Sequence, residues 1–307
     1  MKIKVLEETP RKVLEFPLDN DLNLTEKEVE DVAEIFKTPL TGSYNWDYTI
    51  QDNRIKRLYE LGKELNWNVE KDIDWDQPMP EREDSPPAIF WDEYEPYQKL
   101  STEDKFKFLQ HRASWSISQF LHGEQGALLV ASQLVSCAPT YNAKLYAASQ
   151  TFDEARHVEA FNKYIQKRVG LSYPIGHGLK SLLDKILSDP RWDLKFIGMQ
   201  IIIEGLALAA FNNMKFILND GLLKQLLHYV IRDEARHVTF GVNYLEDYLK
   251  TLSKSEIDDR AEFHQVDCNY LNALNNITKG YDHIFHTACY PHEGLSVFSP
   301  HLVCNNL

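Results

Sequence analysis

The stretch DEARHV occurs at residues 153–158 and again, letter for letter, at residues 233–238. The two copies are 80 residues apart, and the same offset carries Glu124, in FLHGEQGALL, onto Glu204, in IIIEGLALAA. Each half of the repeat therefore supplies one glutamate in an apolar segment, followed by a Glu-x-x-His segment. A shared order and a shared offset indicate a duplicated pair of helices.

The spacing within DEARHV brings its glutamate and its histidine together. On a helix, residues three positions apart lie on one face, so Glu154 and His157 point the same way, and so do Glu234 and His237. A buried carboxylate costs several kcal/mol unless something neutralises it, and a lone one takes up a proton instead. The four glutamates carry a charge of −4 when both imidazoles are neutral, which two divalent cations would balance.

One Glu from each of two helices, plus a Glu-x-x-His from each of two others, is the ligand pattern of di-metal four-helix bundles. A single Glu-x-x-His is common by chance, and the alternative is a duplicated helical hairpin with buried ion pairs. The agreement of two hexapeptides and two glutamates in order and offset favours the metal site. The sequence predicts a catalytic di-metal centre whose ligands are Glu124, Glu154, His157, Glu204, Glu234 and His237.

The residues beside the ligands predict a supporting layer. Ligating histidines usually donate their other ring N–H to a carboxylate or a carbonyl. Because the helices run antiparallel, we expect crossed pairs, Asp153 with His237 and Asp233 with His157. The arginines of the two copies would then pair with these aspartates, and the alternative is a surface ion pair at i,i+3 spacing within each copy. The predicted supporting residues are Asp153, Asp233, Arg156 and Arg236.

Helical periodicity dominates the chain after residue 100, and no alternating run there is long enough for a sheet. The predicted fold class is all-α, a four-helix bundle with extra helices and an extended N-terminal arm. Helices are expected over about 102–135, 139–169 (with Pro139 at its first position), 177–188, 191–217, 221–250 and 254–277.

The chain is predicted to have three parts. Residues 1–100 form an N-terminal arm packed on the bundle, residues 101–280 form the di-metal bundle, and residues 281–307 form a C-terminal tail. Within the arm, we expect short helices over 25–37 and 53–67 and an extended proline-rich stretch over 68–98, anchored by aromatic side chains.

Composition excludes several classes of partner. The charge of −13, from 33 Lys+Arg against 46 Asp+Glu, argues against nucleic acid or an anionic membrane surface. The four cysteines lack metal-binding spacing, and a reducing cytoplasm is the simplest location. The N-terminus has no apolar signal-peptide core. The most apolar stretch, 196–211, contains Gln200 and Glu204 and is shorter than the roughly 20 residues of a membrane span, so we expect a core helix.

With these residues in place, the sequence resembles the ferritin-like carboxylate-bridged di-iron superfamily over about residues 101–250. The Asp-Glu-x-Arg-His string in both halves is most similar to the hydroxylase subunits of bacterial multicomponent monooxygenases. The resemblance implies that Glu124 and Glu204 are terminal ligands, that Glu154 and Glu234 bridge, and that each histidine caps one iron.

Departures from the subfamilies limit what can be carried over. Phe161 stands where the ribonucleotide reductase radical subunit keeps a tyrosine, and Leu208 where the monooxygenases keep a threonine. Val230 replaces the third histidine of arylamine N-oxygenases. Gly126 and Met199 occupy the places where we would look for the Val–Tyr crosslink of the ligand-binding oxidases, so none is expected.

Carboxylate and imidazole ligands suit iron, with Mn/Fe or Mn as alternatives, and two ferrous ions can deliver two electrons to O₂. We therefore expect a di-iron oxygenase or oxidase that acts on a small, largely apolar organic substrate. A ferredoxin or reductase would supply electrons, and a homodimer is the candidate assembly. The predicted substrate cavity is lined by Phe120, Ala127, Leu128, Ala131, Gln200, Ile201, Ala207, Leu208 and Phe211, although small residues there could serve only close helix packing.

Two other functions remain open at this point. One is a ferroxidase or metal-handling protein with no organic substrate, and the other is a radical-generating subunit. An enclosed apolar pocket beside the metals would favour the oxygenase, whereas an acidic funnel from the surface would favour the ferroxidase. The histidines of the C-terminal tail, among them His283 and His286, are expected to pack rather than to bind a second metal.

Overall fold

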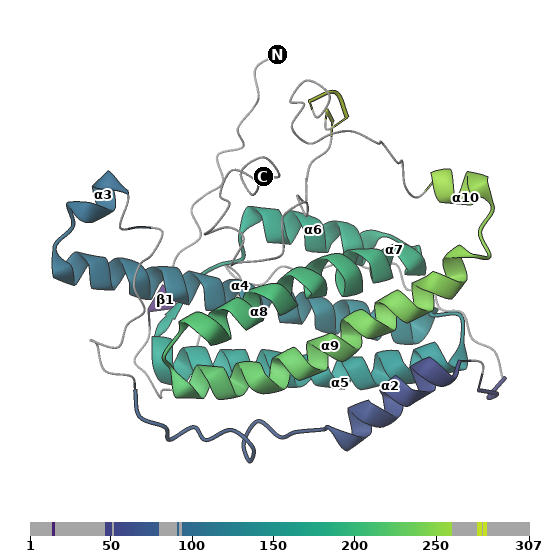
Figure 1. Cartoon of the computed structure of the whole chain (residues 1–307), viewed down its shortest axis with the longest axis horizontal. Helices are drawn as coiled ribbons and strands as arrows, with labels where there is room; N and C mark the ends of the chain where they lie inside the picture. Colours follow the sequence, from purple (N-terminus) through teal and green to yellow (C-terminus); the bar gives the residue numbers. More distant parts are fainter. Residues whose placement is uncertain are drawn as a thin grey trace, which may run out of the picture. The chain divides into compact units, whose positions relative to one another are not determined.

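The long helices of the computed structural model lie side by side as a bundle (Figure 1). They are α4 (Thr102–Cys137), α5 (Tyr141–Tyr164), α8 (Glu204–Ile217) and α9 (Gly221–Leu249). The only strands among the described residues are β1 (Leu14–Glu15) and β2 (Leu171–Ser172), which form one short antiparallel pair. The predicted all-α bundle is therefore confirmed. The structure describes residues 14–15, 47–50, 52–79, 91, 94–259, 275–277 and 279–280.

Helices α4 and α5 form a hairpin because α4 ends at Cys137 and the N-cap of α5, Thr140, follows almost at once. The Ser101 hydroxyl accepts a backbone N–H of the first turn of α4 at 3.1 Å, and Thr140 caps α5 in the same way. The Lys144 ammonium donates to the Ser136 carbonyl at 2.8 Å. The last carbonyls of a helix have no helical partners and attract cations, so this lysine of α5 stabilises the end of α4.

The third long segment of the bundle contains a wider turn. It begins as α7 (Trp192–Phe196), continues as the π-helix η3 (Ile197–Ile203) and resumes as α8 at Glu204. The sequence predicted one continuous helix over 191–217, and the structure keeps that span helical apart from Arg191. A π-helical turn holds an extra residue, rotates the side chains that follow and occurs often at functional sites. Here it ends directly before one of the predicted ligands.

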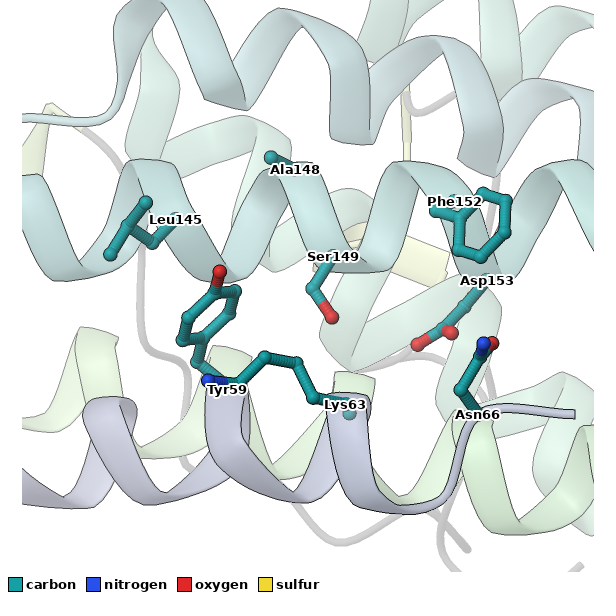
Figure 2. Close-up of a pocket in the computed structure, with 9 residues that line it drawn as sticks. Tyr59, Lys63, Asn66, Leu145, Ala148, Ser149, Phe152 and Asp153 are labelled. Carbon is teal, nitrogen blue, oxygen red and sulfur yellow. The ribbon is translucent and has the colours of Figure 1, made fainter.

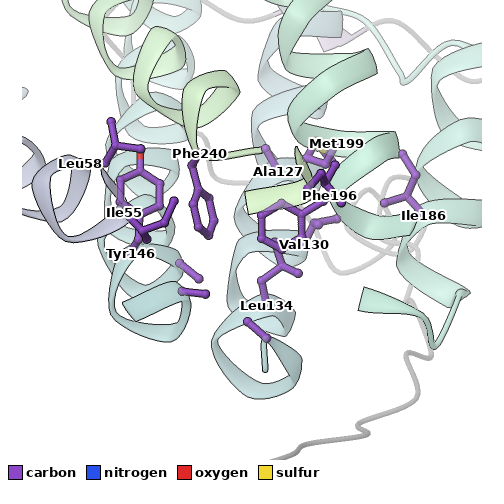
Figure 3. Packing of buried hydrophobic residues seen from close by; sticks show 14 of the residues in the cluster. Ile55, Leu58, Ala127, Val130, Leu134, Tyr146, Ile186, Phe196, Met199 and Phe240 are labelled. Atoms are coloured by element: carbon purple, nitrogen blue, oxygen red, sulfur yellow. The ribbon is translucent and has the colours of Figure 1, made fainter. Parts of the chain in front are cut away.

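Two further helices flank the bundle. Helix α2 (Asn53–Glu64) packs on α5 and α9, and α6 (His177–Ser188) packs on α4. The Asp52 carboxylate begins α2 by accepting the Arg54 backbone N–H at 2.8 Å. Figure 3 shows Ile55 of α2 beside Tyr146 of α5 and Phe240 of α9, all three fully buried.

The buried apolar residues form two clusters on either side of the predicted ligands. On α5, Ala147 belongs to one cluster and Ala160 to the other, and the ligands of that helix lie between them in sequence. On α9, Val230 and Phe240 enclose the ligands in the same manner. The bundle therefore carries a polar layer in the middle of an apolar interior.

The predicted helix over 139–169 differs from the structure in how it begins and ends. Pro139 lies just before the N-cap Thr140 and is not the first helical residue of α5. Helix α5 ends at Tyr164, followed by the π-helix η2 (Ile165–Val169), which stops at Gly170 with φ 67°. Only glycine adopts this left-handed conformation without cost.

The stretch predicted as extended contains a short helix, α3 (Glu95–Gln98), with Pro96 in its first turn, where proline is tolerated. The predicted helix over 53–67 ends earlier, at Glu64. The predicted helix over 25–37 lies outside the described residues, as do most of 254–277 and the tail histidines.

By contact density, the chain divides into two compact units, Met1–Lys250 and Thr251–Leu307. The first unit contains the bundle and its flanking helices, and the second contributes α10 (Lys254–Asp258), which begins with a capping box at Ser253. The predicted boundaries at residues 100 and 280 stay predictions.

The run Trp192–Ile217 is the one helical stretch in the described part of the chain that is long and apolar enough to cross a membrane. Length and composition alone are weak evidence, because core helices of soluble proteins pass the same test. Gln200 and Glu204 lie within this run and are 0% and 2% exposed, and both face polar groups of α5. These contacts are those of a bundle helix.

Candidate metal centre

The structure brings all six predicted ligands together in the polar layer of the bundle. Helix α4 supplies Glu124, α5 supplies Glu154 and His157, α8 supplies Glu204 at its first residue, and α9 supplies the remaining pair. None of the six is more than 5% exposed. Because residues three apart on a helix share a face, each Glu-x-x-His pair points inward as a unit. The remaining pair is Glu234 and His237.

The ligand atoms fall into two groups, within each of which all atoms lie within 4.8 Å of one another. One group has four members, Glu124, Glu154, His157 and Glu234, and the other has three, Glu154, Glu204 and His237. Glu154 belongs to both groups, which is the place of a bridging ligand. Glu234, also expected to bridge, is grouped with the first set only.

The histidines face the centre with the same ring atom. His157 Nδ1 lies 3.0 Å from Glu124 Oε2 and 3.2 Å from Glu154 Oε2. His237 Nδ1 lies 3.1 Å from the other oxygen of Glu154, Oε1. The Glu154 carboxylate therefore spans the space between the two imidazoles.

Burial and mutual repulsion set the protonation of the glutamates in the metal-free chain. Burial raises the pKa of Glu124 to about 8, although His157 opposes the shift. Burial, together with the Glu234 carboxylate, raises the pKa of Glu204 well above its usual value. Burial would also raise the pKa of Glu154, but His237 and His157 outweigh it and hold that pKa below its usual range.

The histidines hold protons when no cation is present. Burial lowers the pKa of His157, but Glu124 and Asp233 outweigh it and raise that pKa well above 6.5. The pKa of His237 is raised in the same way, mainly by Glu154 and Glu234, against the effect of burial. Protons therefore supply the positive charge that the carboxylates need, and a cation would have to displace them.

Each imidazole is held from behind by an aspartate of the other Glu-x-x-His helix. His157 Nε2 lies 3.3 Å from Asp233 Oδ2, and His237 Nε2 lies 3.2 Å from Asp153 Oδ2. The contacts cross between α5 and α9, and they leave Nδ1 of each ring facing the centre. The aspartates thus fix the ring orientation that a metal ligand needs.

The two arginines join both aspartates into a closed, buried square. The Arg156 guanidinium contacts Asp153 and lies 3.2 Å from Asp233. The Arg236 guanidinium lies 2.9 Å from Asp153 and 2.8 Å from Asp233. All four side chains are at most 6% exposed, so the pairs within each DEARHV copy are not surface ion pairs.

Trp67, which no sequence pattern marked as functional, also contacts this layer from the segment that follows α2. Its indole Nε1 donates to Asp233 Oδ2 at 2.6 Å, and the ring stacks on His157 with centroids 6.3 Å apart. Trp67 is 3% exposed. A tryptophan in an irregular segment carries no periodic signal, so only the folded chain reveals this contact.

Gln150 is a second contact that was not predicted, and it lies one turn before Glu154 on α5. Its amide nitrogen donates to Glu154 Oε1 at 3.0 Å and to Glu204 Oε1 at 2.8 Å. Gln200, the polar member of the predicted cavity lining, donates to the Gln150 amide oxygen at 3.4 Å. Both glutamines are fully buried.

Several residues predicted to line a substrate cavity are buried in contacts with other side chains, and the cavity itself stays a prediction. Phe120 and Phe211 lie in edge contact with ring centroids 4.7 Å apart, and both contact Phe161. Ala127 and Ala131 are 3% and 0% exposed. Leu128, Ile201, Ala207 and Leu208 are half-buried.

A described pocket of about 420 Å³ lies between α2 and α5 (Figure 2). Tyr59, Lys63 and Asn66 line one side, and Ser149 and Asp153 are among the α5 residues on the other. It contains none of the predicted cavity residues. Its lining meets the centre at Asp153, whose carboxylate also contacts His237.

Comparisons with known proteins return structures with di-metal centres. No family model matches the sequence, and no curated protein matches it. An R2-like ligand-binding oxidase from Sulfolobus acidocaldarius is 22% identical, with a TM-score of 0.45, over 64% of this chain and 72% of that chain. An R2-like ligand-binding oxidase with a Mn/Fe cofactor is 22% identical, with a TM-score of 0.44, over 62% and 68%.

The dimanganese(II) NrdF of Streptococcus sanguinis is 15% identical, with a TM-score of 0.47, over 71% of this chain and 75% of that chain. These neighbours are ferritin-like di-metal carboxylate proteins, the kind of protein that the motif order resembles. Because the identities are 22% or lower and the TM-scores are below 0.5, the functional argument rests on the residues of this chain alone.

Proposed function

We propose that this chain is a two-metal oxidoreductase that reduces O₂ and oxidises a small organic molecule. The observation that carries the proposal is the pair of ligand groups that share Glu154 inside a buried bundle. A purely structural cluster would not need four carboxylates at one place in an apolar interior, because burying each one is costly.

Unpartnered atoms support a fit for cations. Glu154 Oε2, Glu204 Oε2, Glu234 Oε2 and His237 Nδ1 are all buried and make no hydrogen bond of good geometry, although the first, third and fourth have ion-pair contacts within the cluster. Buried polar atoms are normally paired, and these four are oxygen and imidazole atoms of the type that bind iron and manganese. Two divalent cations would satisfy them and balance the charge of the four carboxylates.

The proposed cofactor is a pair of iron ions, with Mn/Fe or two manganese ions as alternatives, since the neighbours carry Mn/Fe or dimanganese cofactors. Such a pair would supply electrons to O₂. The chain would hold it through the six ligands, orient the imidazoles through Asp153 and Asp233, and exclude bulk water through the apolar clusters on either side.

The rest of the proposal concerns partners. We propose a small, largely apolar substrate and a ferredoxin or reductase as electron donor. We also propose a cytoplasmic location and a homodimer. Cys137 is a free thiol, which is compatible with a reducing compartment. The pocket between α2 and α5 reaches the supporting layer of the centre through Asp153.

Oxygen uptake by the anaerobically Fe(II)-loaded protein tests this function against the two alternatives. With a chemical reductant present, an oxidase continues to consume O₂ and keeps its iron at the stoichiometry of two ions per chain. A ferroxidase instead accumulates oxidised iron beyond that stoichiometry, and a radical-generating subunit develops a persistent organic EPR signal after one exposure. Uptake no faster than in free Fe(II) solution would contradict the proposal.

A matched pair of variants makes the oxygen test specific. Glu154→Ala removes the shared ligand, and we expect it to abolish protein-dependent O₂ uptake. Glu159→Ala removes a glutamate of the same helix that lies outside the ligand groups, and we expect uptake like that of the wild type. Equal uptake by both variants would show that the reaction does not occur at this centre.

A further inference from the structure

The internal repeat is broken at the two glutamines that contact the centre. The offset of 80 residues that relates the ligands carries Gln150 onto Val230 and Phe120 onto Gln200. Two amides therefore lie near Glu204. Gln200 is one turn before it on its own segment, and Gln150 is one turn before Glu154 on α5. Glu124 has Phe120 and Val230 at the corresponding places, both packed in one apolar cluster.

The orientation of the Gln150 amide follows from its partners. The pKa of Glu154 is held below its usual range by the two histidines, and an ionised carboxylate only accepts hydrogen bonds. The Gln150 amide nitrogen therefore faces Glu154 Oε1, and its second hydrogen reaches Glu204 Oε1. The amide oxygen then faces Gln200, whose nitrogen donates to it at 3.4 Å. The two glutamines form a chain of hydrogen bonds that ends on Oε1 of both Glu204 and Glu154.

This chain of hydrogen bonds occupies one of the two carboxylate oxygens of Glu204. Oε1 accepts the Gln150 amide at 2.8 Å, whereas Oε2 is buried and unpartnered. One oxygen of Glu204 is thus left for a cation. The group that contains Glu204 also has three members, against four for the group that contains Glu124.

We infer that Gln150 and Gln200 are positioning residues that make the two cation positions unequal, so that the position formed by Glu154, Glu204 and His237 fills second and more weakly. The inference rests on the proposed two-metal function. It adds a difference in affinity between the two cation positions, which the identical ligand motifs of the two halves do not predict.

Gly241 accounts for how Gln200 reaches its place. A Cβ added to Gly241 would lie 2.6 Å from the Cβ of Gln200, which is closer than packed carbon atoms approach. The glycine on α9 therefore lets η3 come close enough for the amide chain to form. Replacing it offers a way to displace Gln200 while every ligand and both amides remain.

The experiment is an anaerobic titration of the full chain with Mn²⁺ alone, followed by calorimetry and by the EPR signal of free Mn²⁺. The wild type is expected to bind in two resolved steps. In Gln150→Leu, the second step should weaken by about 10–100-fold, the range for losing a partner of a metal ligand, while the first step changes less than about threefold. Gly241→Ala should weaken the second step in the same direction.

Gln133→Leu is the matched control. Gln133 is also a buried glutamine that donates one hydrogen bond, to the Leu187 carbonyl at 3.3 Å, and no described hydrogen bond joins it to a predicted ligand. We expect both steps to be unchanged in this variant. Because Gly241→Ala retains the amides, it tests the inference even if Gln150→Leu does not fold.

The outcomes separate the two claims. Two equal steps in the wild type, or equal weakening of both steps in Gln150→Leu and Gly241→Ala, would overturn the positioning role and leave the two-metal function intact. A wild type that binds no Mn²⁺ would overturn the proposed function and the inference together.

Discussion

The indole Nε1 of Trp67 donates to Asp233 Oδ2 at 2.6 Å, and that same oxygen lies 3.3 Å from His157 Nε2. This contact ties the segment after α2 to the centre across 166 residues of sequence. The aspartate also contacts both arginines. The Asp233 carboxylate thus contacts the segment after α2, both arginines of the square and the predicted ligand His157.

Trp67→Phe is predicted to destabilise the protein and to weaken cation binding. A hydrogen bond to a charged group contributes about 1.5–3 kcal/mol, and the free energy of unfolding in urea should fall by about that amount. Trp75→Phe is the control, because the Trp75 indole donates to the neutral Val69 carbonyl and a neutral bond contributes roughly 1 kcal/mol. Equal losses in both variants, with unchanged cation affinity, would contradict the role assigned to Trp67.

Asp153→Ala is predicted to lower cation affinity by about 10–100-fold without removing the site, because the His237 ring loses the carboxylate that orients it. The measurement is Mn²⁺ affinity by competition with a chelator. Unchanged affinity in a folded variant would show that the crossed contacts have no part in holding metal.

Arg236→Met is predicted to cost about 3–5 kcal/mol of unfolding free energy, since it leaves the two buried carboxylates of Asp153 and Asp233 with a single arginine, Arg156, between them. Arg54→Met provides the contrast, because Arg54 pairs with Asp52 and Asp247 at the surface, where ion pairs contribute about 0–1 kcal/mol. A loss of under about 1 kcal/mol in Arg236→Met would contradict the buried square.

The metal-free protein is predicted to lose stability as the pH rises. The pKa of Glu124 is about 8 in the folded chain against 4.5 ordinarily, so the folded chain holds a proton that the unfolded chain releases, and stability falls through that window. The raised pKa values of Glu204 and His157 act in the same direction. The lowered pKa of Glu154 acts the opposite way, but only at acidic pH.

Thermal unfolding at several pH values between about 6 and 9 checks this dependence. The melting temperature of the metal-free chain should fall as the pH rises. The metal-loaded chain should not fall in parallel, because cations replace the protons and bind more tightly as the pH rises. A flat or rising curve for the metal-free chain would contradict the assigned protonation states.

The bundle was predictable because a repeat of ligand-like residues in apolar, helically periodic segments is typical of a di-metal helical bundle. The π-helix η3 was not, because a single extra residue in a helical turn leaves no periodic trace over a short apolar run such as IGMQIII. Trp67 was not predictable either, since its contact depends on a long-range approach of an irregular segment.

Gln150 was detectable in principle. It lies one turn before a predicted ligand, at a place where the repeat has valine in its other half. Comparing the halves for differences, rather than for shared residues, would have selected it. The predicted apolar cavity stays a prediction, and the contact between Phe120 and Phe211 within its expected lining depends on long-range packing that the sequence does not reveal.

The most direct test of the central claim is the metal content of the chain after anaerobic loading with Fe(II) and removal of unbound metal. The account predicts two ions per chain for the wild type and for Glu159→Ala, and fewer than two for both Glu154→Ala and Glu234→Ala. Two ions per chain in either ligand variant, or none in the wild type, would contradict it.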